Sequence, residues 1–208
     1  MRATRLLLAL FLLAAVPASA LPPEKARRAV EAAKELLGRP YQFGGRLRGE
    51  QGIDCQGLVF YALERIHSCG WKSFSVFPTE SVSRKELGYG VPGLFPVTTA
   101  ELDVSQLQAG DVVMLLAEAP NPAEPAMFTL DGTRLWVWHV GMATGNGRWI
   151  NADPFAGQVI EGDLMAYLLE HEYLGIAVTR MERGPKPQRC RQHPPMGESK
   201  ARTAAATP

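Results

Sequence analysis

Residues 52–59 read Gly-Ile-Asp-Cys-Gln-Gly-Leu-Val, in which a cysteine directly follows an aspartate. Asp54 is a favourable helix cap, and apolar residues follow over 58–66 with helical spacing. Cys55 is therefore expected in the first turn of a helix. There the helix dipole and the unpaired backbone N–H groups favour an anion, so we expect a lowered thiol pKa and donors for an oxyanion. The alternative is that Cys55 is a small buried apolar residue, the usual place of a free cysteine.

A second stretch supplies partners for such a thiol. Residues 139–151 read His-Val-Gly-Met-Ala-Thr-Gly-Asn-Gly-Arg-Trp-Ile-Asn. Alternation predicts strands over 135–143 and 149–152, joined by a glycine-rich turn, and one register of this pair places Asn151 beside His139. A thiol nucleophile needs a histidine to hold its proton and a polar group to orient the imidazole. The order Cys, His, Asn along the chain also occurs in papain-like peptidases.

Length and composition favour one domain that is exported. The chain has 208 residues and is 46% hydrophobic, enough for one substantial core. Residues 1–20 combine two arginines, an apolar run over 6–16 and a small-residue Ala-Ser-Ala site, which predicts a signal peptide. An anchor that is never cleaved is the alternative. We expect a catalytic domain over 21–182 and a disordered tail over 183–208, with export to the periplasm or the medium.

Charge and hydropathy argue against nucleic acid as a partner and against an integral membrane segment. Without Arg2 and Arg5 of the leader, 20 basic residues face 21 acidic ones. Such a balance does not indicate nucleic-acid binding. No stretch after the leader has the roughly 20 apolar residues of a transmembrane helix, so we expect no integral membrane segment once the signal is removed.

The three cysteines fit one disulfide and one free thiol. If Cys55 is the nucleophile, Cys69 and Cys190 are left to pair, which would tie the C-terminal extension to the domain.

The remaining patterns predict a mixture of helices and strands. Two stretches, 71–109 and 118–134, show no clean period and are interpreted as long connections or insertions, the first with a short helix near 99–106. Alternation over 135–143 places Trp136, Trp138, Val140 and Met142 on one face and His139 on the other. The tryptophans, with Trp149, could line a glycan groove, although strand aromatics are more often core. His67 and His171 are expected on solvated helix surfaces. The predicted elements are helices 23–37 and 162–172 and strands 112–117 and 176–180.

Four segments together resemble the NlpC-type family of cell-wall cysteine peptidases. These segments are Pro-Tyr-Gln-Phe-Gly-Gly at 40–45, the cysteine stretch at 52–59, Gly-Asp-Val-Val at 110–113 and His-Val-Gly-Met at 139–142. The resemblance implies an α+β, papain-like fold in which the cysteine helix packs on an antiparallel sheet. It also implies Cys55 as nucleophile, His139 as base and Asn151 as third member. By the same resemblance Tyr41 lines the active site, and Asp54 faces a substrate amine.

One position departs from this family. The residue after the cysteine is usually serine, whereas here it is Gln56, whose larger amide reshapes the subsite shared with Asp54. We expect a secreted peptidase that hydrolyses an amide bond in peptidoglycan stem peptides or a related peptide, without a metal or organic cofactor. An amidase or acyltransferase on a non-wall substrate is the first alternative, and a non-catalytic wall-binding protein is the second.

Overall fold

The computed structural model describes residues 23–46, 52–67, 71–120 and 126–181. The predicted leader at 1–20 and the predicted tail at 183–208 lie outside the described residues. So do Cys69 and Cys190, and their pairing stays a prediction.

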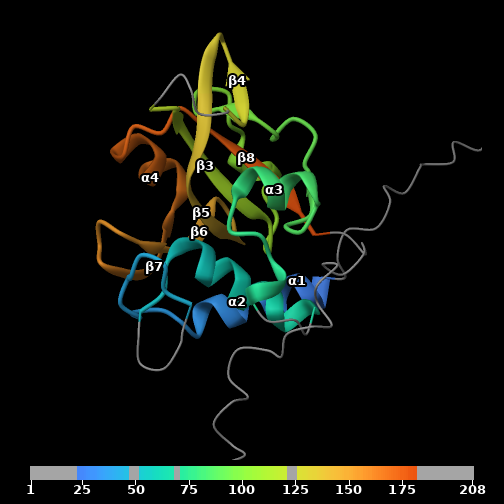
Figure 1. Ribbon diagram of the computed structural model, residues 1–208, viewed down its shortest axis with the longest axis vertical. Helices are drawn as coiled ribbons and strands as arrows, with labels where there is room; N and C mark the ends of the chain where they lie inside the picture. Colours follow the sequence, from blue (N-terminus) through green and yellow to red (C-terminus); the bar gives the residue numbers. More distant parts are fainter. Residues whose placement is uncertain (1–22, 47–51, 68–70, 121–125, 182–208) are drawn as a thin grey trace, which may run out of the picture.

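The described residues form one antiparallel sheet of eight strands, with the order β1-β8-β3-β5-β6-β7; β2 also pairs with β8, and β4 with β5 (Figure 1). The longest strand, β5, lies between β3 and β6. The strands are β1 (Tyr89–Gly90), β2 (Val97–Thr98), β3 (Val112–Glu118), β4 (Phe128–Leu130), β5 (Thr133–Gly145), β6 (Arg148–Asp153), β7 (Gln158–Asp163) and β8 (Gly175–Arg180).

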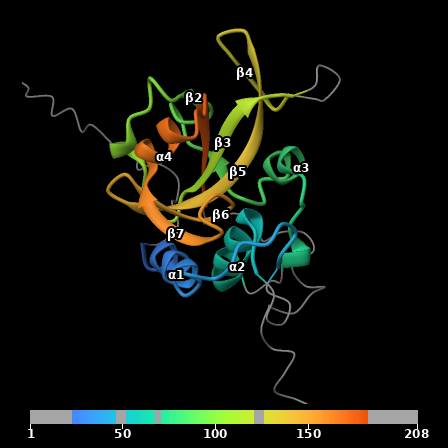
Figure 2. The same cartoon turned by 90° about the vertical axis from the view of Figure 1, so that its left-hand side faces the viewer.

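Helices cover both faces of this sheet. The α-helices are α1 (Pro23–Lys34), α2 (Cys55–His67), α3 (Pro78–Ser83) and α4 (Leu164–Glu170), and two short 3-10 helices span Trp71–Ser73 (η1) and Val104–Gln106 (η2). The buried side chains of α1 and α2 share one core with Met114 and Met142 of the sheet, whereas α4 shares a second core with Val113 and Leu115. Figure 2 shows α1 and α2 together beneath the sheet. None of the described helices is both long and apolar enough to cross a bilayer.

This arrangement confirms the expected α+β fold, with the cysteine-bearing helix packed on an antiparallel sheet. The stretch 71–109, interpreted from sequence as a largely irregular connection, contains α3, two 3-10 helices and two short strands. Between β3 and β5, residues 128–130 form β4, which extends the tip of the sheet beside β5. These short elements have too few residues to show a period, so the sequence pattern missed them.

The expected alternation along β5 is wrong on one side of Trp138. The register against β3 pairs Leu115 with His139 but Leu116 with Val137, so Trp138 is an extra, unpaired residue. A bulge of this kind reverses which side chains face the core. Val137 therefore lies in the same core as Val140 and Met142, whereas Trp138 is 51% exposed.

The Gly-Asp pair at the start of β3 has a structural role. Asp111 is buried, and its two carboxylate oxygens accept from Nε and Nη2 of Arg180 on β8, each at 2.7 Å. Gln108 also donates its backbone N–H to Asp111, at 2.9 Å. The carboxylate thus fastens the central strand to its neighbour and to the loop that precedes it.

Candidate active site

Asp54 caps the helix that carries Cys55, as the sequence predicts. Its Oδ1 accepts the backbone N–H of Gly57 at 2.7 Å, and its carbonyl accepts that of Leu58 at 3.0 Å. Cys55 is the first residue of α2 and is a free, partly exposed cysteine. Gly57 permits the close packing of this turn, because a Cβ there would lie 2.5 Å from the carbonyl oxygen of Gly45. The first turn is thereby held against the loop at 41–46.

His139 and Asn151 meet in the interior of the sheet. The histidine on β5 is 4% exposed, the asparagine on β6 is fully buried, and His139 Nε2 lies 2.8 Å from Asn151 Oδ1. With the amide oxygen as acceptor, Nε2 carries the hydrogen and Nδ1 is left with a lone pair. The imidazole also packs edge-on against Trp149, with 5.8 Å between the ring centroids. Gly141 allows this approach of the strands, since a Cβ there would lie 2.6 Å from the Trp149 ring.

The predicted site residues gather around one cavity. Cys55 and His139 both line a cavity of about 650 Å³, together with Tyr41, Asp54 and Gln56. Asn151 is not among the lining residues; it contacts the site through His139. The structure thus brings all six predicted residues into one place, five on the cavity wall and one behind it.

The thiol is not acidified by its position at the helix start. Burial, followed by the charge of Asp54, raises the pKa of Cys55 to about 12. Backbone hydrogen bonds from Val140 and Gln56 act in the opposite direction but are the smaller effects. Burial also lowers the pKa of His139, although the bond to Asn151 favours the charged imidazole. The expectation of a lowered thiol pKa is therefore wrong, because desolvation outweighs the helix terminus. The resting pair is a neutral thiol and a neutral imidazole.

Arg46 is a site residue that the sequence did not indicate. It forms an ion pair with Asp54, in which both side chains are almost fully buried. Its Nη2 also donates to Gln56 Oε1 at 3.0 Å, and Gln56 Nε2 donates to the carbonyl of Val76 at 2.8 Å. Gly44 donates its backbone N–H to Asp54 Oδ2 at 3.0 Å. Asp54 and Gln56 are thus already engaged with protein groups.

Further lining residues come from the end of α4 and its surroundings. His171 was expected on a solvated helix surface, but it lines the cavity and stacks on Phe155, with centroids 4.2 Å apart. Tyr173 also lines the cavity, and burial raises its pKa to about 12. Of the tryptophans, Trp136 and Trp138 line the cavity, whereas Trp149 is fully buried in the core.

Comparison with known proteins places the fold. No family model matches the sequence. Among solved structures, an N-acetylmuramoyl-L-alanine amidase from Bacteroides uniformis matches with a TM-score of 0.55 and 13% identity, covering 77% of this chain and 100% of that one. NlpC2 from Trichomonas vaginalis matches with a TM-score of 0.51 and 21% identity, covering 75% of this chain and 46% of that one.

NlpC1 from Trichomonas vaginalis gives a TM-score of 0.48 at 23% identity, covering 74% of this chain and 43% of that one. This chain therefore spans less than half the length of the two Trichomonas proteins. At 21% and 13% identity, the likeness to NlpC2 and to the amidase lies in the fold alone. The chain has the NlpC-type, papain-like fold.

Proposed function

We propose that this protein is a thiol hydrolase that cleaves an amide bond in the peptide stems of peptidoglycan. The observation that carries the proposal is the buried His139–Asn151 contact of 2.8 Å beside a cavity that Cys55 also lines. A nucleophile, a base and an orienting amide in this relation are the parts that acyl transfer needs. The peptidoglycan substrate is supported by the likeness of the fold to an N-acetylmuramoyl-L-alanine amidase.

The proposed reaction has two halves. Cys55 Sγ attacks the amide carbonyl carbon while its proton passes to His139 Nδ1, and the first-turn N–H groups of α2 stabilise the oxyanion. The C–N bond then breaks, the leaving amine takes the proton from His139, and a thioester remains on Cys55. Water next gives a proton to His139 and adds its oxygen to the thioester. The C–S bond breaks, and the sulfur takes that proton back.

Neutral resting forms agree with this sequence of steps. Because burial raises the thiol pKa and lowers the imidazole pKa, the proton transfer is coupled to attack rather than completed beforehand. Asn151 holds the tautomer in which Nδ1 is the base. We also propose that residues 1–20 direct export, since a wall substrate lies outside the cytoplasm.

The test is to incubate the purified protein and its Cys55→Ala variant with soluble peptidoglycan fragments and to identify products by mass spectrometry. Cleavage by the wild-type protein alone supports the proposal, and the product masses name the bond. Equal cleavage by both proteins, or by neither, contradicts it.

A second candidate is a thiol amidase or acyltransferase that acts on a non-wall substrate. It is favoured by one observation, namely that Asp54, the predicted partner of a substrate amine, is already paired with Arg46. The same thioester would form, and either water or another amine would take the acyl group.

A further inference from the structure

The cavity beside Cys55 extends into the apolar interior. Its deep wall consists of side chains that are each at most 6% exposed and that come from α2, from β3 and from the end of residues 75–87, which include α3 and are called the α3 segment below. These side chains are Val59, Phe60, Leu87 and Met114. A volume of about 650 Å³ is within the range of small-molecule sites, and it opens directly onto the sulfur and the imidazole.

The mouth of this cavity is also apolar. Phe43, Trp138 and Phe155 line it while remaining 89%, 51% and 67% exposed, and Val76 beside them is 43% exposed. Large apolar side chains gathered at a cavity rim indicate a binding surface rather than the scattered exposure of a usual surface. Such a rim favours an apolar group of a substrate over a charged one.

Among the described residues that line the cavity, Asp54 supplies the one carboxylate, and it is not open to a ligand. Asp54 is 5% exposed, it is paired with Arg46, and it accepts the N–H groups of Gly44 and Gly57. A substrate ammonium would have to displace a buried guanidinium, at a desolvation cost that an exposed pair would not have. Gln56 is held in the same way between Arg46 and Val76. The wall next to the sulfur is therefore effectively uncharged.

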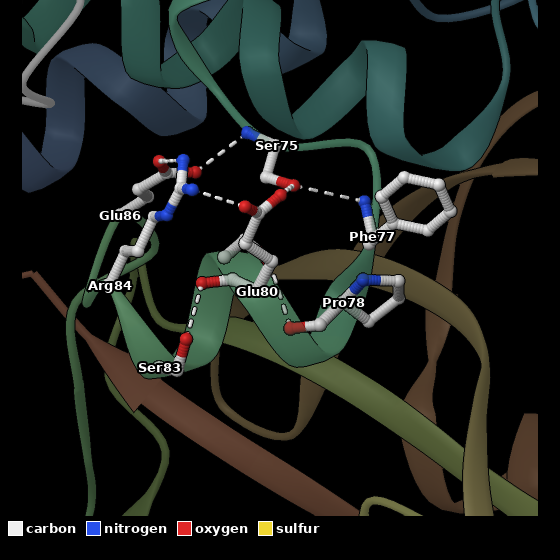
Figure 3. Close-up of polar contacts among 8 residues, drawn as sticks. Ser75, Phe77, Pro78, Glu80, Ser83, Arg84 and Glu86 are labelled. Carbon is white, nitrogen blue, oxygen red and sulfur yellow. Dashed lines mark hydrogen bonds and ion pairs between the residues drawn. The ribbon is translucent and has the colours of Figure 1, made fainter. Parts of the chain in front are cut away.

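The α3 segment, which supplies part of the cavity lining, is held by a network of polar contacts. Ser75 is not among the residues that line the cavity. Its backbone N–H donates to Glu86 at 2.6 Å, and its hydroxyl donates to Glu80. Arg84 pairs with both Glu80 and Glu86 (Figure 3). None of these four side chains is among the described residues that line the cavity, whereas Val76, Pro78 and Leu87 of the same segment line it. The apolar wall is thus part of an ordered element.

We propose that this cavity binds an uncharged aliphatic acyl chain and presents its carbonyl carbon to Cys55. The inference rests on the proposed thiol chemistry of Cys55. It does not depend on peptidoglycan as the source of the substrate. It assigns Arg46 and Gln56 as the residues that exclude a free amine from the acyl side. The apolar wall described above determines the preference for long chains.

Binding to the Cys55→Ala variant tests the proposal without requiring turnover. Calorimetric titration compares N-decanoylalanine amide with N-acetylalanine amide and with a dialanine amide whose amine is free. Each buried methylene tightens binding by about fourfold, so burial of half of the additional chain predicts a preference on the order of a hundredfold for the decanoyl compound. Equal binding of the decanoyl and acetyl compounds, or tighter binding of the free amine, overturns the proposal.

Two variants locate the site, each made in the Cys55→Ala background. Ala117→Trp fills the cavity from β3, and Val76→Asp adds a charge at its exposed rim without disturbing the core; both should reduce the chain-length preference at least tenfold. Leu169→Ala, at an exposed position of α4 outside the cavity lining, is the control and should keep it. A preference that survives in both cavity variants refutes this location. If the wild-type protein does not cleave peptidoglycan but the chain-length preference is present, only peptidoglycan as the substrate is ruled out.

Discussion

Removal of the Arg46 guanidinium should destabilise the protein by about 3 kcal/mol. The side chains of Arg46 and Asp54 are 9% and 7% exposed, and loss of one partner of a buried pair typically costs about 3–5 kcal/mol. Asp54 would keep two backbone donors, from Gly44 at 3.0 Å and Gly57 at 2.7 Å, which places the expectation at the lower end. Urea unfolding of Arg46→Met, followed by circular dichroism, measures this free energy.

The variant Arg65→Met shows how much stability is lost when an exposed, paired arginine is removed, and so isolates the effect of burial at Arg46. Arg65 also pairs with a glutamate, Glu35, and lies over an aromatic ring, Tyr61, as Arg46 lies over Phe60. The Arg65 and Glu35 side chains are 48% and 56% exposed, so Arg65→Met should cost less than about 1 kcal/mol.

A double variant tests the electrostatic cause. Arg46→Met with Asp54→Asn removes both charges and keeps an amide oxygen for the cap of α2. It should recover at least half of the stability lost in the single variant. Equal losses for Arg46→Met and Arg65→Met, or no recovery in the double variant, would refute the assignment of a buried charge pair.

The remaining predictions concern the proposed pair of Cys55 and His139 and the sheet. Because burial raises the pKa of Cys55 to about 12, the rate of alkylation by iodoacetamide should rise about tenfold per pH unit from pH 7 to 10. An alkylation rate that no longer changes above pH 7 would contradict a neutral thiol. Because burial lowers the pKa of His139, hydrolysis should be lost only below its ordinary value of 6.5, and an acid limb centred above that value would count against it. Asn151→Ala should lower kcat on the order of a hundredfold with the urea midpoint measured in parallel, whereas a kcat near wild type would end its orienting role. Gly141→Ala should destabilise by about 1–3 kcal/mol, since a Cβ there would meet the next strand at 2.6 Å; Gly162→Ala, with nothing within 4 Å, is the control, and equal unfolding midpoints for the two would contradict the clash.

Local signals in the sequence predicted the parts of the site that depend on local structure. The cap at Asp54 and the helix that begins at Cys55 follow from side-chain chemistry within a few residues. The proximity of His139 and Asn151 follows from two strands joined by a short turn, for which few registers are available.

The features that the sequence did not reveal depend on tertiary packing. Arg46 has no local pattern that marks it as the partner of a buried carboxylate, because the pairing arises only when the loop folds over α2. The thiol pKa depends on how many protein atoms surround the sulfur, and helix position alone gives the wrong direction. Residues 158–163 form the edge strand β7. A segment of six residues that includes a glycine is too short to predict a strand from its pattern.

The extra residue at Trp138 divides β5 into two segments with different functions. On one side, residues 139–142 keep the pairing with β3 that positions the imidazole, and on the other side, residues 133–137 continue into the projecting tip with β4. Since the phase change is absorbed at Trp138, the tip can be lengthened, shortened or exchanged without rotating His139 out of place. A change at the tip should therefore alter the part of the cavity wall that Trp136 supplies while His139 keeps its place.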